Sequence, residues 1–268
     1  MSYRTALSEV LTSAVGPVAE ATAVQGRFPR GAVTALGRAG LLGLTVSTGF
    51  GGGGGGLREA VDVVARTARV CPATAAVLQS HYTAVAVIEA YGGPWTRGEI
   101  AAGRHLASLA LAESEGEPEA GGDGPTAETQ LLVPRSVATR SGEVVALRAR
   151  KQRVVAAGEA DLYVWSSRPL AAPDGLTLWA VPAHAPDLFV PARPGVAGPC
   201  GSATSTVFAD PVRVPAEAML GADGGGLDIV LRTVLPWLFE LRAAAETRRP
   251  PALDLGSVRR PAGSLATS

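Results

Sequence analysis

Apolar residues recur every three or four positions through the first hundred residues of the chain, which predicts a series of helices. The first stripe consists of Leu7, Val10, Leu11, Ala14 and Val18. Pro29 suits the first turn of a second helix that runs toward Leu36, with Gly40 as its stop. Further helices are predicted from Leu57, from Pro72 and around Trp95. The glycine run at 51–56 separates two of them, because six glycines lose too much backbone entropy to form a helix or a strand.

The pattern changes near His105, where short apolar runs separated by Gly, Pro, Asp or Ser replace the helical period. The predicted strands cover residues 106–112, 130–133, 144–147, 162–165, 176–181 and 204–208. Short strands at this spacing are typical of an antiparallel sheet folded as a small barrel or a sandwich.

One long helical pattern follows from Leu227 to Glu246, and Pro236 inside it is expected to kink it or to mark a local irregularity. The remaining residues have no apolar period and are expected to be disordered. The sequence therefore predicts an α+β protein with four parts. They are an all-helical N-terminal domain (1–104), a middle antiparallel β-barrel or sandwich domain (105–222), the first helix of a truncated C-terminal helical bundle (223–247), and a disordered tail (248–268).

Composition narrows the class of protein. The chain has 268 residues, of which 47% are apolar, so it can bury a sizeable core. Its 24 basic and 24 acidic side chains balance, which argues against a nucleic-acid partner or a polybasic membrane surface. No apolar run reaches the ~18 residues that a membrane span needs. The two cysteines cannot make a disulfide framework, so a reducing, cytoplasmic location is expected.

Several short motifs, taken in order, resemble the acyl-CoA dehydrogenase family. They are Phe28-Pro29, the run from Ala39 to Leu44, Gly51-Gly52, Arg58-Glu59, Ser80-His81-Tyr82, Ala160-Asp161, the run from Val212 to Pro215, Leu220-Gly221 and the glycines at 224–226. The resemblance implies a helical domain, a β domain and a helical bundle. It also implies an oxidoreductase and flavoprotein that uses FAD to dehydrogenate an acyl thioester of coenzyme A or of a carrier protein.

The family's flavin loop reads Thr-Glu-Pro-x-Ala-Gly-Ser-Asp, and residues 116–123 resemble it. The resemblance places Gly116, Glu117, Gly121 and Gly122 at the cofactor, with Gly122 also beside the thioester substrate. The Thr and Ser positions hold glycines, so only backbone donors remain there. In an alternative register, Ala112-Glu113 takes the place of Thr-Glu.

A second flavin segment of the family reads Lys-x-Trp-Ile-Thr, and this chain has Lys151-Gln152-Arg153-Val154-Val155. The resemblance therefore implies flavin contacts from Arg153, Val154 and Val155. The family's Trp is replaced by Arg153 and its Thr by Val155. A guanidinium can still stack on a planar ring.

The catalytic base is the least defined part of the resemblance. Some family members carry it on the first helix of the bundle, just before an Arg. Glu240 precedes Arg242 by two residues, which is one position off that pattern, or about 100° around a helix. Glu240 is therefore a candidate base, and the alternative is an ordinary solvated carboxylate.

Other conspicuous residues have structural interpretations. His81 lies mid-helix among small apolar residues and is interpreted as a satisfied core histidine. The acidic run at 113–123 is interpreted as a solvated loop. His105, His184 and the two cysteines have no metal-ligand spacing, so no metal site is expected.

Three functional hypotheses follow. The first is an FAD-dependent dehydrogenase of an acyl-CoA or acyl-carrier thioester, completed by a partner chain. In that case the 227–246 helix carries the apolar contact surface of a homo- or hetero-oligomer. The second is a catalytically degenerate or truncated member that works as a binding or assembly module without flavin, or a gene fragment. The third is an unrelated β ligand-binding domain with a helical prefix.

Overall fold

The helices of the N-terminal region form where the apolar periodicity predicts them. The structure is a computed structural model that describes residues 2–113, 134–191 and 198–246. Its first helices are α1 (Tyr3–Val10), a π-helical turn (Leu11–Val15), α2 (Gly16–Gln25), α3 (Arg30–Arg38), α4 (Leu57–Ala68), α5 (Pro72–Tyr91) and α6 (Pro94–Ala101). The glycine run at 51–56 is neither helix nor strand, as expected. The predicted disordered tail lies outside the described residues.

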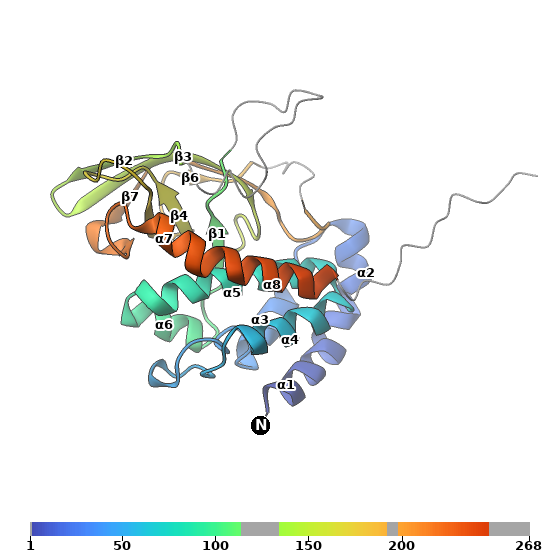
Figure 1. Cartoon of the computed structure of the whole chain (residues 1–268). Coiled ribbons are helices and arrows are strands. Elements are labelled where there is room, and N and C mark those ends of the chain that lie inside the picture. The colour runs from blue at the N-terminus through green and yellow to red at the C-terminus, as the bar shows by residue number, and fades with distance from the viewer. Residues whose placement is uncertain (1, 114–133, 192–197, 247–268) are drawn as a thin grey trace, which may run out of the picture.

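Helix α5 is the central element, and most of its side chains are buried. Pro72 occupies its first turn, where a missing N–H costs nothing. The helix packs against α4 on one side and against α8 and strand β1 on others. Figure 1 shows the strands gathered on one side of the molecule and the helices on the other, with the α7–α8 run between them.

The strands form two separate four-stranded sheets, not a closed barrel. The first sheet has the order β1 (Ala107–Ala110), β4 (Leu162–Ser167), β5 (Thr177–Pro182), β8 (Met219–Leu220). The second has the order β2 (Val137–Ser141), β3 (Val144–Val154), β7 (Ser205–Pro215), β6 (Leu188–Phe189). The apolar faces bury Trp165, Trp179 and Tyr163 completely or nearly so.

The prediction of purely antiparallel strands is wrong for one pair, because β1 and β4 run parallel. The chain leaves β1, crosses to the second sheet to form β2 and β3, and returns to β4 in the same direction. A long crossover of this kind is what parallel neighbours require. The short strands β2, β6 and β8 were not predicted, and the predicted strand at 130–133 lies outside the described residues.

The last helical run is continuous but not uniform. It comprises α7 (Gly226–Ile229), a π-helical turn (Val230–Val234) and α8 (Leu235–Glu246). Pro236 was expected to kink the run or to mark a local irregularity in it. The π-helical turn directly before Pro236 is such an irregularity. No helix among the described residues is long and apolar enough to cross a bilayer.

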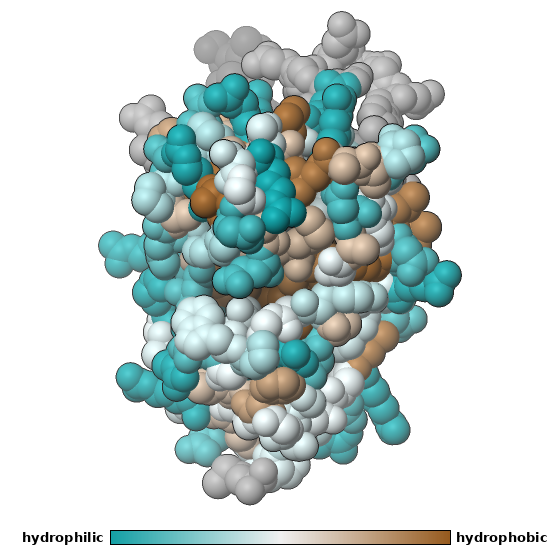
Figure 2. Space-filling model, turned by 90° about the vertical axis from the view of Figure 1, so that its left-hand side faces the viewer, coloured by the Kyte–Doolittle hydropathy of each residue, from teal (hydrophilic) through white to brown (hydrophobic). Residues whose placement is uncertain are grey.

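Hydrophobic side chains occur as separate groups on the face of the molecule that Figure 2 shows. The domain limits at 104, 222 and 247 stay a prediction.

Two glycines bring α3 against the turn that follows α6. A Cβ on Gly103 would lie 2.3 Å from the Gly37 carbonyl oxygen, and Gly103 has a φ of +71°. Gly98, inside α6, has no atom within 4 Å of its missing Cβ.

We expect Gly103→Ala to lower the free energy of unfolding by about 2–5 kcal/mol, because it adds backbone strain to a steric clash. Gly98→Ala is the matched control and should raise it by about 0.5–1 kcal/mol, since alanine is the better helix former. Urea denaturation of both variants checks this. Equal stabilities for the two variants would contradict the close approach of α3 and the turn that follows α6.

Candidate functional site

A cleft of about 420 Å³ lies where helices α4, α5 and α8 face the ends of β1 and β3. Its walls are mainly apolar and include Ala75, Leu109, Leu111, Val155 and Leu238. Its polar lining comes from Gln79, Ser80, Gln152, Arg153, Thr204, Arg242 and Glu246. A mostly apolar cavity with few polar groups is the usual form of a small-molecule site.

Two serine hydroxyls tie α5 to the strands at the base of the cleft. The Ser108 hydroxyl donates to the Val155 carbonyl oxygen at 2.6 Å and lies 2.8 Å from the Ser80 hydroxyl. Ser80 Oγ accepts from the Leu109 N–H at 3.0 Å. Since the Ser108 proton is used, the Ser80 hydroxyl donates to Ser108. Both hydroxyl protons are therefore committed within the protein, and neither is free for a ligand.

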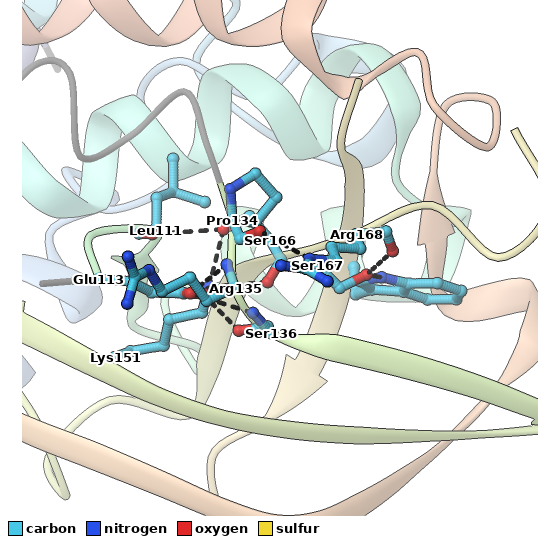
Figure 3. Close-up of polar contacts among 10 residues, drawn as sticks. Leu111, Glu113, Pro134, Arg135, Ser136, Lys151, Ser166, Ser167 and Arg168 are labelled. Atoms are coloured by element: carbon cyan, nitrogen blue, oxygen red, sulfur yellow. Dashed lines mark hydrogen bonds and ion pairs between the residues drawn. The ribbon is translucent and has the colours of Figure 1, made fainter. Parts of the chain in front are cut away.

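Lys151 and Glu113 form a buried ion pair (Figure 3), and each is the chain neighbour of a residue that lines the cleft, Gln152 and Ala112. The Lys151 ammonium also donates to the Ser166 carbonyl oxygen at 2.7 Å and to the Ser166 hydroxyl at 2.8 Å. Its Nζ lies 5.4 Å from the centre of the Trp165 ring. Burial lowers the pKa of Lys151 to about 8, against the opposing effect of the Glu113 carboxylate. All three donor protons of the ammonium thus have partners.

The Glu113 carboxylate also joins two distant parts of the chain. It accepts from the Arg135 N–H at 2.5 Å, from the Ser136 N–H at 3.0 Å and from the Ser136 hydroxyl. Next to it, the Ala112 carbonyl oxygen accepts from the Gln152 N–H at 2.8 Å. One carboxylate therefore fixes the end of the β1 segment, the approach to β2 and, through Lys151, strand β3.

The burial of Glu113 corrects the interpretation of the whole acidic run at 113–123 as a solvated loop. The structure also places Ala112-Glu113 beside Lys151-Gln152. In the alternative register this contact joins the two predicted flavin segments, whereas the loop at 116–123 lies outside the described residues. Lys151 is the only lysine of the chain, but the predicted strand ended at Leu147, so the apolar pattern gave no signal that this cation is buried.

The predicted cofactor residues divide into three groups. Gly116, Glu117, Gly121 and Gly122 lie outside the described residues. Arg153 and Val155 both line the cleft.

Val154 is fully buried in the hydrophobic core and is not among the residues that line the cleft. Any contact between its side chain and a ligand in the cleft would need the core to open. Its expected role at the flavin therefore stays a prediction.

The candidate base Glu240 is exposed on α8 and is not among the cleft residues. The same helix contributes Arg242 and Glu246 to the cleft instead. These two side chains pair with each other at 3.0 Å. Glu240 and Arg242 are two residues apart and therefore point in different directions from the helix, so Arg242 can line the cleft while Glu240 does not.

Strained backbone borders the cleft. Arg153 has a φ of +54° and lies in a β-bulge between Lys151 and Val154. Ala156 and Ala203 also have positive φ values, of 54° and 50°. Two backbone hydrogen bonds join their segments: the Ala156 N–H donates to the Ser202 carbonyl oxygen (3.0 Å), and the Ala157 N–H donates to the Ala203 carbonyl oxygen (2.9 Å). Strained non-glycine residues cluster at functional sites, and sequence reasoning had no signal for them.

His81 is a core histidine, as interpreted from the sequence. Its Nδ1 accepts from the Ala107 N–H at 3.1 Å, so its protonated Nε2 donates to the Leu42 carbonyl oxygen at 2.9 Å. The ring is completely buried, and desolvation lowers its pKa to about 4. His81 is therefore neutral and structural. The described residues contain no group of three or more potential metal ligands.

The folded state takes up a proton at His81 only near pH 4, whereas the unfolded state does so near pH 6.5. The unfolded state binds more protons in this window, so the free energy of unfolding falls as the pH drops through it. The loss from this one residue is up to about 3 kcal/mol. The test variant is His81→Gln, whose amide can make the same two hydrogen bonds. Urea denaturation between pH 7.5 and pH 4 should show that its free energy of unfolding falls less with decreasing pH than that of the unmodified protein. The same dependence in both proteins would refute this assignment.

Glu113→Gln should lower the free energy of unfolding by about 3–5 kcal/mol, because it leaves the buried Lys151 ammonium without its counterion. The double variant Glu113→Gln/Lys151→Met should recover part of this loss. Asp228→Asn breaks the exposed pair of Asp228 and Arg232 and is the control, with an expected loss below about 1 kcal/mol. A loss in Glu113→Gln no larger than in the control would show that the ion pair carries little stability.

Comparisons with known proteins agree with this architecture. Residues 2–102 match the family model described as "Acyl-CoA dehydrogenase, N-terminal domain". The chain is 27% identical over 224 residues to an acryloyl-CoA reductase (NADH) of Anaerotignum propionicum, covering 81% of this chain and 55% of the relative. It is 26% identical over 227 residues to an acyl-CoA dehydrogenase of Bacillus subtilis, covering 81% and 56%.

The fold matches butyryl-CoA dehydrogenase from Megasphaera elsdenii with a TM-score of 0.76 and 21% identity, covering 91% of this chain and 63% of that one. The chain spans just over half the length of the two curated relatives. These findings confirm the resemblance seen in the sequence: residues 2–102 match the N-terminal domain model of the acyl-CoA dehydrogenase family, and the chain is similar to such enzymes over its helical and β regions.

Proposed function

We propose that the cleft holds a flavin and an acyl thioester, and that the chain takes part in the FAD-dependent α,β-dehydrogenation of that thioester. One observation carries the proposal. Ala112, Gln152, Arg153 and Val155 all line the cleft, and a backbone hydrogen bond joins Gln152 to Ala112. Gln152, Arg153 and Val155 belong to the second predicted flavin segment, and Ala112 belongs to the first one only in the alternative register. The fold around the cleft is that of butyryl-CoA dehydrogenase.

The residues of the cleft fit the ring system of a flavin. Leu109, Leu111 and Val155 offer an apolar surface, and the Gln152 amide offers both a donor and an acceptor. The Arg153 guanidinium is planar and can lie on an aromatic ring. When bound, FAD supplies the hydride acceptor. The protein's own part is to hold the ring and to exclude water from it.

We propose that the flavin loop contributes only backbone donors, from Gly116, Glu117, Gly121 and Gly122. Gly122 is also the residue proposed to contact the thioester. This role rests on the resemblance alone. In the described part of the cleft, the hydroxyl proton of Ser80 is already used within the protein.

The base for the α proton is proposed to come from outside the described residues. In the described part of the cleft, Glu246 is the acidic lining residue, and Arg242 holds its carboxylate. The exposed Glu240 stays a prediction to which the cleft geometry gives no support. The relatives have a large additional part, which this chain does not match.

The helical run α7–α8 is the proposed contact surface for the missing part, either within a longer chain or in a homo- or hetero-oligomer. Three of its large apolar side chains are exposed, namely Leu227, Leu231 and Phe239. Leu227 and Leu231 are four residues apart and therefore neighbours on the surface of the run, and Phe239 lies further along it on α8. Burying them would complete the bundle that the resemblance implies.

The second candidate function is a non-catalytic binding or assembly module without flavin. The replacement of both hydroxyl residues of the flavin loop, and of the Trp and Thr of the second segment, favours it. The cleft would then bind a ligand without transferring a hydride.

FAD titration separates the two. The flavoprotein proposal predicts a saturable change of flavin absorbance and a gain of about 2.7 kcal/mol in stability at a concentration 100 times Kd. Ala76→Phe should abolish both, because Ala76 lines the cleft and is only half-buried. Ala90→Phe, at an exposed position of the same helix, is the control. Equal FAD binding by the two variants would place the flavin elsewhere, and no binding by the unmodified protein would favour the second function.

A further inference from the structure

Arg153 carries an unbalanced charge in the cleft. Its side chain makes no hydrogen bond and no ion pair with any described residue, whereas the Arg242 side chain is paired with Glu246. The charges of Arg242 and Glu246 cancel, so the described lining has one net positive charge at Arg153. Most of the other lining residues are apolar.

The backbone at Arg153 is fixed from both sides. The Gln152 N–H donates to the Ala112 carbonyl oxygen, and the Val155 carbonyl oxygen accepts from Ser108. Between these anchors, Arg153 holds a φ of +54°, which an arginine rarely adopts. The bulge therefore fixes the position from which the Arg153 side chain leaves the backbone at the wall of the cleft. Such strain is usually retained where a function needs it.

A guanidinium offers two different surfaces. Its face stacks on planar rings, and its edge donates paired N–H groups that match the two oxygens of a carboxylate or phosphate. A flavin on the face leaves the edge unused. An unpaired cation at the rim of an apolar cavity fits a ligand that is apolar along most of its length and bears one oxyanion.

We propose that Arg153 binds an oxyanion of an amphipathic ligand in the cleft, and that this oxyanion is a carboxylate on the acyl chain. The inference rests on the proposed function, since it takes the cleft as the thioester site. A phosphate of the carrier offers the same chemistry, and the experiment below distinguishes the two sources.

The test is a calorimetric titration of the flavin-free protein with succinyl-CoA and butyryl-CoA, which differ in the terminal carboxylate. Succinyl-CoA should bind about tenfold more tightly. Arg153→Gln should remove this preference. Arg148→Gln should keep it, because Arg148 lies on the same strand but pairs with Asp210 on the surface.

Arg153→Gly guards against a folding artefact, because glycine adopts a positive φ without strain. It should be as stable as the unmodified protein and should also lose the preference. Weakening of both esters by the same factor in the Arg153 variants would support the oxyanion site with phosphate as its source. Unchanged affinities in those variants, or no binding of either ester by the unmodified protein, would overturn it. Because FAD is absent, this result is independent of the FAD titration.

Discussion

The structure depends on one buried charge that must be compensated. Removing an ammonium from water costs on the order of several kcal/mol, and Lys151 is completely buried. Its compensation comes from Glu113 and from the carbonyl and hydroxyl oxygens of Ser166. These partners belong to different parts of the chain. The requirement to satisfy one cation therefore brings β3, β4 and the end of the β1 segment together.

The cleft is a consequence of this constraint. Glu113 directly follows Ala112 in the chain, and Lys151 directly precedes Gln152. Ala112 and Gln152 both line the cleft. On the opposite side, Ser80 on α5 is held by Leu109 and Ser108 of the strand region. The helical and β regions are thus connected by polar contacts at the base of the cavity, while its walls are left apolar. A cavity of this kind suits a ligand with a long apolar part and few polar groups.

Local signals in the sequence were enough for the helices. Pro72 and Pro94 begin helices, and the glycine run at 51–56 separates two others. The strands were harder to predict, because β3 continues past Leu147 through Arg148, Arg150 and Lys151. These charged residues end the apolar run although the strand goes on. The parallel pairing of β1 with β4 depends on a crossover between sheets, for which no short-range pattern exists.

The site was predictable only in part. Sequence reasoning identified the segment around Arg153, because its family motif begins with the only lysine. It did not identify Glu113 as the partner of that lysine. The two residues are 38 positions apart, and Glu113 adjoins four further acidic residues that look like a solvated loop. Burial of one carboxylate among several is decided by tertiary contacts, not by spacing.

The most direct test of the account is amide hydrogen exchange in the unmodified protein and in Glu113→Gln, under conditions where both are folded. If the buried pair holds the wall of the cleft, exchange should accelerate in peptides that cover Leu109–Ala112 and Gln152–Ala157, while α1 keeps its protection. Unchanged protection at the cleft wall in Glu113→Gln would show that the ion pair does not build the site.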